Sequence, residues 1–112
     1  MPAVPTIGAE EAARRVDDGA LLLDVREPDE WQAGHAPEAI HVPLASLAAR
    51  ANELDQDRPV VAVCRSGGRS ERAAAALRQR GYDAVNLGGG MQAWSASGLA
   101  VVTDDGEAGQ II

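Results

Sequence analysis

The sequence lacks lysine and phenylalanine, and it contains a single cysteine and only two histidines. With one cysteine, Cys64, the chain cannot form an internal disulfide, and it has too few thiols for a cysteine-based metal site. All ten basic residues are arginines, and seventeen acidic residues bring the formal net charge to -7. This acidic balance argues against nucleic acid or an anionic membrane as a partner. We therefore expect neither partner, no bound metal and no other cofactor.

Long apolar runs are also missing. No stretch reaches the ~18 apolar residues of a membrane span, and residues 1–11 lack the basic and apolar segments of a secretion signal. A soluble, cytoplasmic protein is therefore expected. A length of 112 residues is typical of one domain. We predict a single domain over residues 1–112, with loose segments at 1–5 and 103–110.

Short apolar segments alternate along the chain with segments of helical pattern. Strands are expected at 20–25, 39–42, 60–63 and 84–87, and helices at 9–16, 29–33, 43–54, 70–80 and 91–96. Ser70 and Glu71 have the residue types of a helix N-cap and first-turn acid. Strands that alternate with helices predict an α/β fold whose parallel sheet is covered by helices on both faces.

Cys64 directly follows the apolar run at 60–63 and begins the segment Cys64-Arg65-Ser66-Gly67-Gly68-Arg69. In an open parallel sheet, ligands bind beyond the carboxyl ends of the strands. If the segment curls around the sulfur, its glycines permit a sharp turn, and its N–H groups, its two guanidinium groups and the next helix favour negative charge. A thiol in such a setting has a lowered pKa and is a nucleophile without a histidine base. A cysteine that only fills the core would need neither the glycines nor the arginines.

The loop from Cys64 to Arg69, with Ser70 opening the helix, resembles the active-site loop of the rhodanese family. Asp24–Trp31 together with Gly34–Ile40 resembles the N-terminal signature of that family. Leu87–Gly89 with Trp94 and Gly98 resembles the C-terminal one. Two departures, Glu38 and Ala100 in place of glycine and proline, lie outside the loop and bear on local turns.

This resemblance implies a rhodanese-like three-layer fold, with a central parallel sheet of about five strands. It also implies a thiosulfate sulfurtransferase in which Cys64 is the catalytic nucleophile and carries sulfur as a persulfide. The donor would be a small sulfur anion such as thiosulfate, and the acceptor cyanide or a thiol of a small molecule or protein. The substrate-binding residues would be Arg65, Ser66, Gly67, Gly68 and Arg69. We infer that the side chains of Arg65 and Arg69 contact the anion.

Two other functions stay open at this point. A phosphatase or arsenate reductase also uses a cysteine in an anion cradle, but the phosphatase pattern needs an arginine six residues after the cysteine, where this chain has Ser70. A sulfur-relay or regulatory module would use the same Cys64 but would be fed by a protein partner. The sequence does not separate this module from a free-standing enzyme.

Other conspicuous residues are interpreted as structural. His35 and His41 are not needed for the mechanism, and Asp24, Arg26 and Glu30 are expected to form a salt-bridged scaffold near the site. Gly88-Gly89-Gly90 lacks the spacing of a phosphate-binding loop, so we predict a tight turn from strand to helix there.

Overall fold

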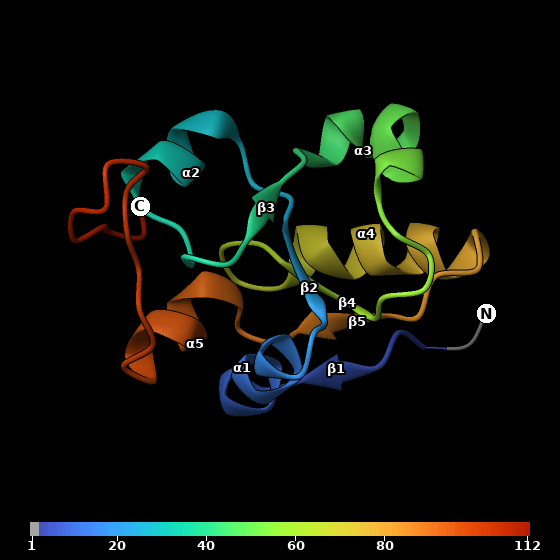
Figure 1. Cartoon of the computed structure of the whole chain (residues 1–112), viewed down its shortest axis with the longest axis horizontal. Coiled ribbons are helices and arrows are strands. Elements are labelled where there is room, and N and C mark those ends of the chain that lie inside the picture. Colours follow the sequence, from blue (N-terminus) through green and yellow to red (C-terminus); the bar gives the residue numbers. More distant parts are fainter. Residues whose placement is uncertain (1–2) are drawn as a thin grey trace.

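Five short parallel strands form the centre of the protein, with helices on both sides (Figure 1). The structure, a computed structural model, describes residues 3–112. The strands are β1 (Thr6–Ile7), β2 (Leu21–Asp24), β3 (Ile40–His41), β4 (Val60–Val63) and β5 (Ala84–Leu87). The helices are α1 (Ala9–Asp17), α2 (Pro28–Ala33), α3 (Leu44–Arg50), the 3-10 turn η1 (Ala51–Glu53), α4 (Gly68–Gln79) and α5 (Gly90–Ala96).

The strand order is β1-β5-β4-β2-β3, and every pairing is parallel. β4 is therefore the central strand, and all four of its residues are buried, as are those of β2 and β5. Asp24 at the end of β2 pairs in register with Val63 at the end of β4. The segments that begin at Val25 and Cys64 consequently leave the sheet side by side at its carboxyl edge. The α/β fold with a parallel sheet is confirmed.

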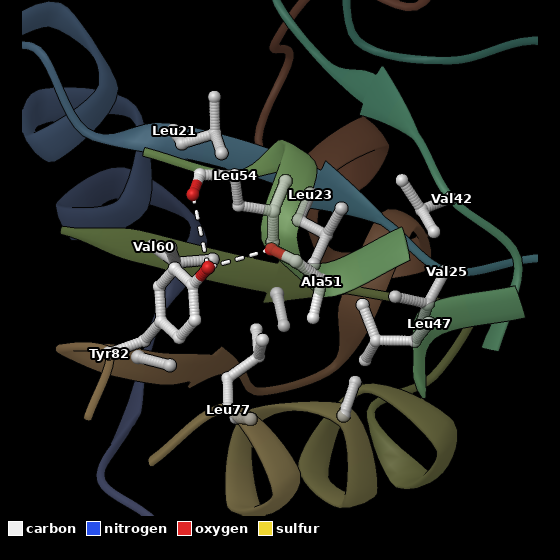
Figure 2. Close-up of a cluster of buried hydrophobic side chains, with 14 of the residues drawn as sticks. Leu21, Leu23, Val25, Val42, Leu47, Ala51, Leu54, Val60, Leu77 and Tyr82 are labelled. Atoms are coloured by element: carbon white, nitrogen blue, oxygen red, sulfur yellow. Dashed lines mark hydrogen bonds between the residues drawn. The ribbon is translucent and has the colours of Figure 1, made fainter. Parts of the chain in front are cut away.

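Each face of the sheet packs against its own helices. Leu21, Leu23 and other side chains on one face meet α3, η1 and α4, whereas Leu22, Val61 and Val63 on the other meet α1 and α5. Figure 1 shows α3 at the top of the view and α1 at the bottom, with the sheet between them. Figure 2 shows the buried cluster that lies between the sheet and the helices α3 and α4. Within residues 3–112, no helix is long and apolar enough to cross a bilayer.

The structure differs from the sequence-based expectation at three places. β1 was not predicted, because a two-residue strand at the sheet edge leaves almost no periodic signal. The helix expected over 43–54 ends at Arg50 and continues as η1. The helix expected from Ser70 begins at Gly68, and its N-cap is Gly67, whose φ of 115° favours glycine. Ser70 therefore lies inside the first turn and is not the cap.

Residues 103–110, where the sequence favours a loose segment, make backbone hydrogen bonds to one another, to Val101 and to the end of α2. The Gln110 N–H donates to the Ala33 carbonyl at 2.8 Å, and the Gly109 N–H donates to the Val101 carbonyl at 2.9 Å. Just before this segment, Val102 forms an antiparallel bridge with His35. Figure 1 shows this red C-terminal segment beside α2. At the other end, residues 1–2 lie outside the described part of the chain, and the Pro5 carbonyl accepts from Asn86 N–H.

Tyr82 supplies a stability test of the core beneath α3. Its buried hydroxyl faces the carbonyls of Ala51 at 2.6 Å and Leu54 at 3.0 Å, and thereby ties η1 to the sheet (Figure 2). Tyr82→Phe should lower the free energy of unfolding by about 1–3 kcal/mol, because buried carbonyls lose their donor. Denaturant unfolding measures this loss. Thr6→Val, which removes an exposed hydroxyl with one 3.5 Å contact, should change it by less than about 0.5 kcal/mol. Equal stability of Tyr82→Phe and wild type would contradict the assignment.

Candidate active site

Cys64 lies where central strand β4 ends and the turn into α4 begins. The residue is buried, with 1% of its surface exposed. Four residues link the end of β4 to the start of α4, and the αL conformation of Gly67 turns the backbone back toward the sulfur. The amino end of a twelve-residue helix therefore lies next to the thiol, where its dipole favours negative charge.

Hydrogen-bond donors surround the sulfur. The Gly67 N–H donates to Sγ at 3.1 Å, and the Ser70 hydroxyl lies 3.3 Å from Sγ. Burial raises the pKa of the Cys64 thiol, but the Ser70 hydroxyl and the backbone N–H groups of Ser70, Gly67 and Ser66 outweigh burial. The pKa consequently lies below its ordinary value, and thiolate formation is favoured without a histidine.

Ser70 also joins Cys64 to Asn86 of strand β5. The Ser70 hydroxyl donates to Asn86 Oδ1 at 2.6 Å, and Asn86 Nδ2 donates to the Gly67 carbonyl at 3.2 Å. The Ser70 hydroxyl therefore has two acceptors within reach, Asn86 Oδ1 and Cys64 Sγ, and its single proton serves one of them at a time. Asn86 thus supports both the hydroxyl and the turn at Gly67.

Neither Ser70 nor Asn86 was recognised as a site residue from the sequence. The available signals were an asparagine inside the otherwise apolar strand 84–87, and a serine one position beyond the loop. Both residues are buried, and a buried polar side chain requires a partner. Sequence alone does not say that this partner is the sulfur site.

The turn after β5 holds the loop from the other side. The N–H groups of Met91 and Gln92, at the start of α5, donate to the carbonyls of Cys64 at 2.7 Å and Arg65 at 3.1 Å. A Cβ atom at Gly90 would collide with both of these loop residues. Gly88-Gly89-Gly90 is therefore a tight strand-to-helix turn, as predicted, and its close approach keeps the cysteine loop in place.

Arg69, the last residue of the loop, forms a bidentate ion pair with Glu30 of α2. Its Nη1 and Nη2 atoms donate to the two carboxylate oxygens at 2.6 and 2.8 Å. The hydrogen bonds from Arg69 lower the pKa of Glu30 to about 2, against the opposing effect of burial. The same pair raises the pKa of Arg69. Arg69, expected to contact an anion directly, thus has its charge compensated by Glu30.

Arg65 points away from the loop and toward the C-terminal segment. Its Nε donates to the Ile112 carbonyl at 2.9 Å. With the amide of Gln92 oriented to satisfy both groups, the Gln92 oxygen accepts from both terminal nitrogens of Arg65 at 3.2 Å. Ser66 and Gly68 are exposed at the rim of the loop. The structure thus places Arg65 to Arg69 around Cys64 through their backbone, while both guanidinium groups have partners.

The expected salt-bridged scaffold is present next to this loop. Arg26 and Asp24 form a fully buried ion pair, with Nη2 to Oδ2 at 2.7 Å. The Arg26 guanidinium also donates to the backbone carbonyls of Glu30 at 3.3 Å and Gly34 at 2.8 Å. These bonds hold the backbone of α2 at Glu30 itself and at the C-cap residue Gly34.

The two histidines belong to an aromatic stack beside α2. Trp31 stacks on His35 with ring centroids 3.6 Å apart and on His41 at 4.8 Å. His35 also contacts the Asp104 carboxylate at 2.9 Å, and the His41 ring nitrogen Nε2 lies 2.7 Å from the Arg26 carbonyl. Among residues 3–112, no group of three or more His, Cys, Asp or Glu residues is arranged to hold a metal ion.

Comparisons with known proteins agree with this architecture. The chain is 42% identical over 106 residues to a sulfurtransferase of Allochromatium vinosum. This match covers 92% of this chain and 99% of the relative. It is 38% identical over 95 residues to a putative sulfur carrier protein, YrkF, of Bacillus subtilis. That match covers 82% of this chain and about half of the relative, 51%.

Solved structures show the same fold. A rhodanese-related protein of Thermoplasma volcanium superposes with a TM-score of 0.84 at 31% identity, over 89% of this chain and 99% of the other. A thiosulfate sulfurtransferase of Pseudomonas aeruginosa matches with a TM-score of 0.81 at 29% identity, over 97% of this chain and 22% of the other. The sequence profile of the rhodanese-like domain matches residues 8–97, which include β2, the cysteine loop and α5. This chain therefore belongs to the rhodanese-like domain family.

Proposed function

We propose that this protein is a sulfurtransferase that moves sulfane sulfur from thiosulfate or another donor to cyanide or a thiol, through a persulfide on Cys64. The observation that carries the proposal is the set of hydrogen-bond donors around Sγ, which come from Gly67 and Ser70 and favour the thiolate. Relatives described as a sulfurtransferase and a putative sulfur carrier support the same chemistry. Cys64 is the proposed catalytic residue.

In the first half-reaction the Cys64 thiolate attacks the outer sulfur of thiosulfate. A bond forms between Sγ and that sulfur, the S–S bond of thiosulfate breaks, and sulfite leaves with the bonding electron pair. The persulfide retains the negative charge that the thiolate brought, so no proton is needed. Backbone N–H groups of the loop Arg65–Arg69, together with the dipole of α4, are suited to stabilise this terminal sulfur.

In the second half-reaction an acceptor removes the outer sulfur. Cyanide attacks it, the bond to Sγ breaks, and thiocyanate leaves while the Cys64 thiolate is restored. A thiolate acceptor would take the sulfur in the same way and become a persulfide. Because the chain has one cysteine, no internal thiol can resolve the persulfide, and the acceptor must come from outside.

The size of the loop favours sulfur over phosphate. Six positions after Cys64 stands Ser70, buried and 3.3 Å from Sγ, where a phosphatase would need an arginine for its tetrahedral anion. A sulfur relay fed by a protein donor is the second candidate, because one relative is described as a putative sulfur carrier. In either case we propose that residues 1–112 act as one rhodanese-like domain with small sulfur compounds or thiols as partners.

Intact-protein mass after incubation with thiosulfate tests the proposal. Wild type should gain the mass of one sulfur atom and lose it on addition of cyanide, because cyanide removes the outer sulfur of a persulfide as thiocyanate. Cys64→Ser should gain nothing and should keep its thermal unfolding transition. A sulfur-free wild type that still alkylates at Cys64 would indicate a module loaded by a protein donor. A cyanide-labile gain in Cys64→Ser would refute the mechanism.

A second prediction concerns the pKa of the Cys64 thiol. Ser70→Ala removes the hydroxyl that faces Sγ, so the thiol pKa should rise and the thiolate fraction at neutral pH should fall. Thiolate absorbance followed against pH gives the midpoint, and persulfide loading from thiosulfate at pH 7 should slow on the order of tenfold. Ser66→Ala, which keeps its backbone N–H, is the matched control and should leave the midpoint unchanged. The same midpoint in wild type and Ser70→Ala would exclude this role.

A further inference from the structure

The cysteine loop contains two arginines, and Glu30 balances the charge of one of them, Arg69. Arg69 interacts electrostatically with Cys64, but it also faces the carboxylates of Glu30 and Glu27. Glu30 holds both terminal nitrogens of Arg69 in a bidentate pair. An anion that reaches Sγ therefore meets an arginine whose positive charge is already offset.

Besides its pair with Arg69, Glu30 is held in position by two further hydrogen bonds. Its carboxylate accepts from the Glu27 N–H at 3.0 Å in a capping box at the start of α2, and its backbone carbonyl accepts from buried Arg26. Its side chain is 13% exposed, so solvent screens the pair with Arg69 less than it screens a surface pair. The Glu30 carboxylate, which compensates Arg69, is therefore held in a defined position at the edge of the cysteine loop.

Neutral hydrogen-bond donors, and not the arginines, are the main groups that stabilise the Cys64 thiolate. The largest favourable influences on the Cys64 pKa come from the Ser70 hydroxyl and three backbone N–H groups, not from a guanidinium. Such groups stabilise the single negative charge on sulfur, which every donor delivers. They supply little long-range attraction for a second negative charge on the leaving group, such as that of sulfite.

We infer that Glu30 is a specificity-determining residue that biases this site toward sulfur donors of low charge, such as persulfides and thiosulfonates, and against the thiosulfate dianion. The inference rests on the proposed sulfur transfer at Cys64. Glu30 acts by compensating Arg69, so it is a positioning residue that does not touch the sulfur. Loss of its charge frees Arg69 to attract the dianion.

The test compares thiosulfate with the methanethiosulfonate anion, which has one negative charge fewer. In both donors the thiolate attacks the outer sulfur, the S–S bond breaks, and sulfite or methanesulfinate leaves with the electron pair. With cyanide as acceptor, the transfer is ping-pong, so kcat/KM for each donor reports only the loading step. The quantity measured is the ratio of kcat/KM for thiosulfate to that for methanethiosulfonate.

Glu30→Gln keeps an oxygen that can cap Glu27 but removes the charge, and it should raise this ratio about fivefold. Arg69→Met leaves Glu30 uncompensated and should lower the ratio. The double variant restores neutrality and should return the ratio to that of wild type.

The rise of the ratio in Glu30→Gln should shrink at high ionic strength. Glu11→Gln, which breaks the Glu11–Arg15 pair on α1, makes the same change in net charge and should leave the ratio unchanged.

The possible results distinguish failure of the proposed role of Glu30 from failure of the proposed sulfur transfer at Cys64. The same ratio in all four proteins, with sulfur transfer intact, would overturn the role of Glu30 alone. A fall in both single variants with no recovery in the double variant would show that the pair only shapes the loop, and would also overturn it. If neither donor loads Cys64 in wild type, the proposed function fails, and this inference fails with it.

Discussion

The buried ion pair between Arg26 and Asp24 connects the sheet to the rim of the site. Both side chains are fully buried. The Arg26 guanidinium also donates hydrogen bonds to the backbone carbonyls of Glu30 and Gly34. A buried guanidinium is tolerated only when its charge and its N–H groups are satisfied, and here the backbone of α2 completes that requirement. Arg26 therefore adds to the contacts that hold Glu30 beside the cysteine loop, together with the pair of Glu30 with Arg69 and the bond to Glu30 from the Glu27 N–H.

The nucleophile itself depends on a different kind of interaction. Cys64 is surrounded by a hydroxyl and backbone N–H groups, whereas the arginines of its loop are bound to Glu30 and to the carbonyl of Ile112. Hydrogen bonds act at short range and favour charge on the sulfur itself. A free guanidinium would also attract distant anions. The thiolate is therefore stabilised by neutral donors, and Glu30 offsets the positive charge of Arg69 beside it.

Two packed turns hold the loop in this shape. The αL conformation at Gly67 starts α4, and the approach of Gly90 lets the first N–H groups of α5 bind the carbonyls of Cys64 and Arg65. Asn86 of β5 supports the first of these turns by accepting from Ser70 and donating to the Gly67 carbonyl. The site is therefore formed between β4 and β5. These strands are neighbours in the sheet, with Val60 and Ala84 in register, although 20 residues lie between the end of β4 and the start of β5.

The sequence by itself determined the α/β alternation, the parallel sheet and the place of Cys64 after its central strand, because apolar runs and glycines act locally. It also indicated the loop Cys64–Arg69 and the scaffold of Asp24, Arg26 and Glu30. Only the tertiary structure decided which partners these groups take. Ser70 belongs to the sulfur site and not to a helix cap, Asn86 supports it from β5, and Arg69 pairs with Glu30, 39 residues away. Such pairings depend on which strand ends lie next to each other at the edge of the sheet. Local residue patterns do not predict contacts between residues so far apart in the sequence.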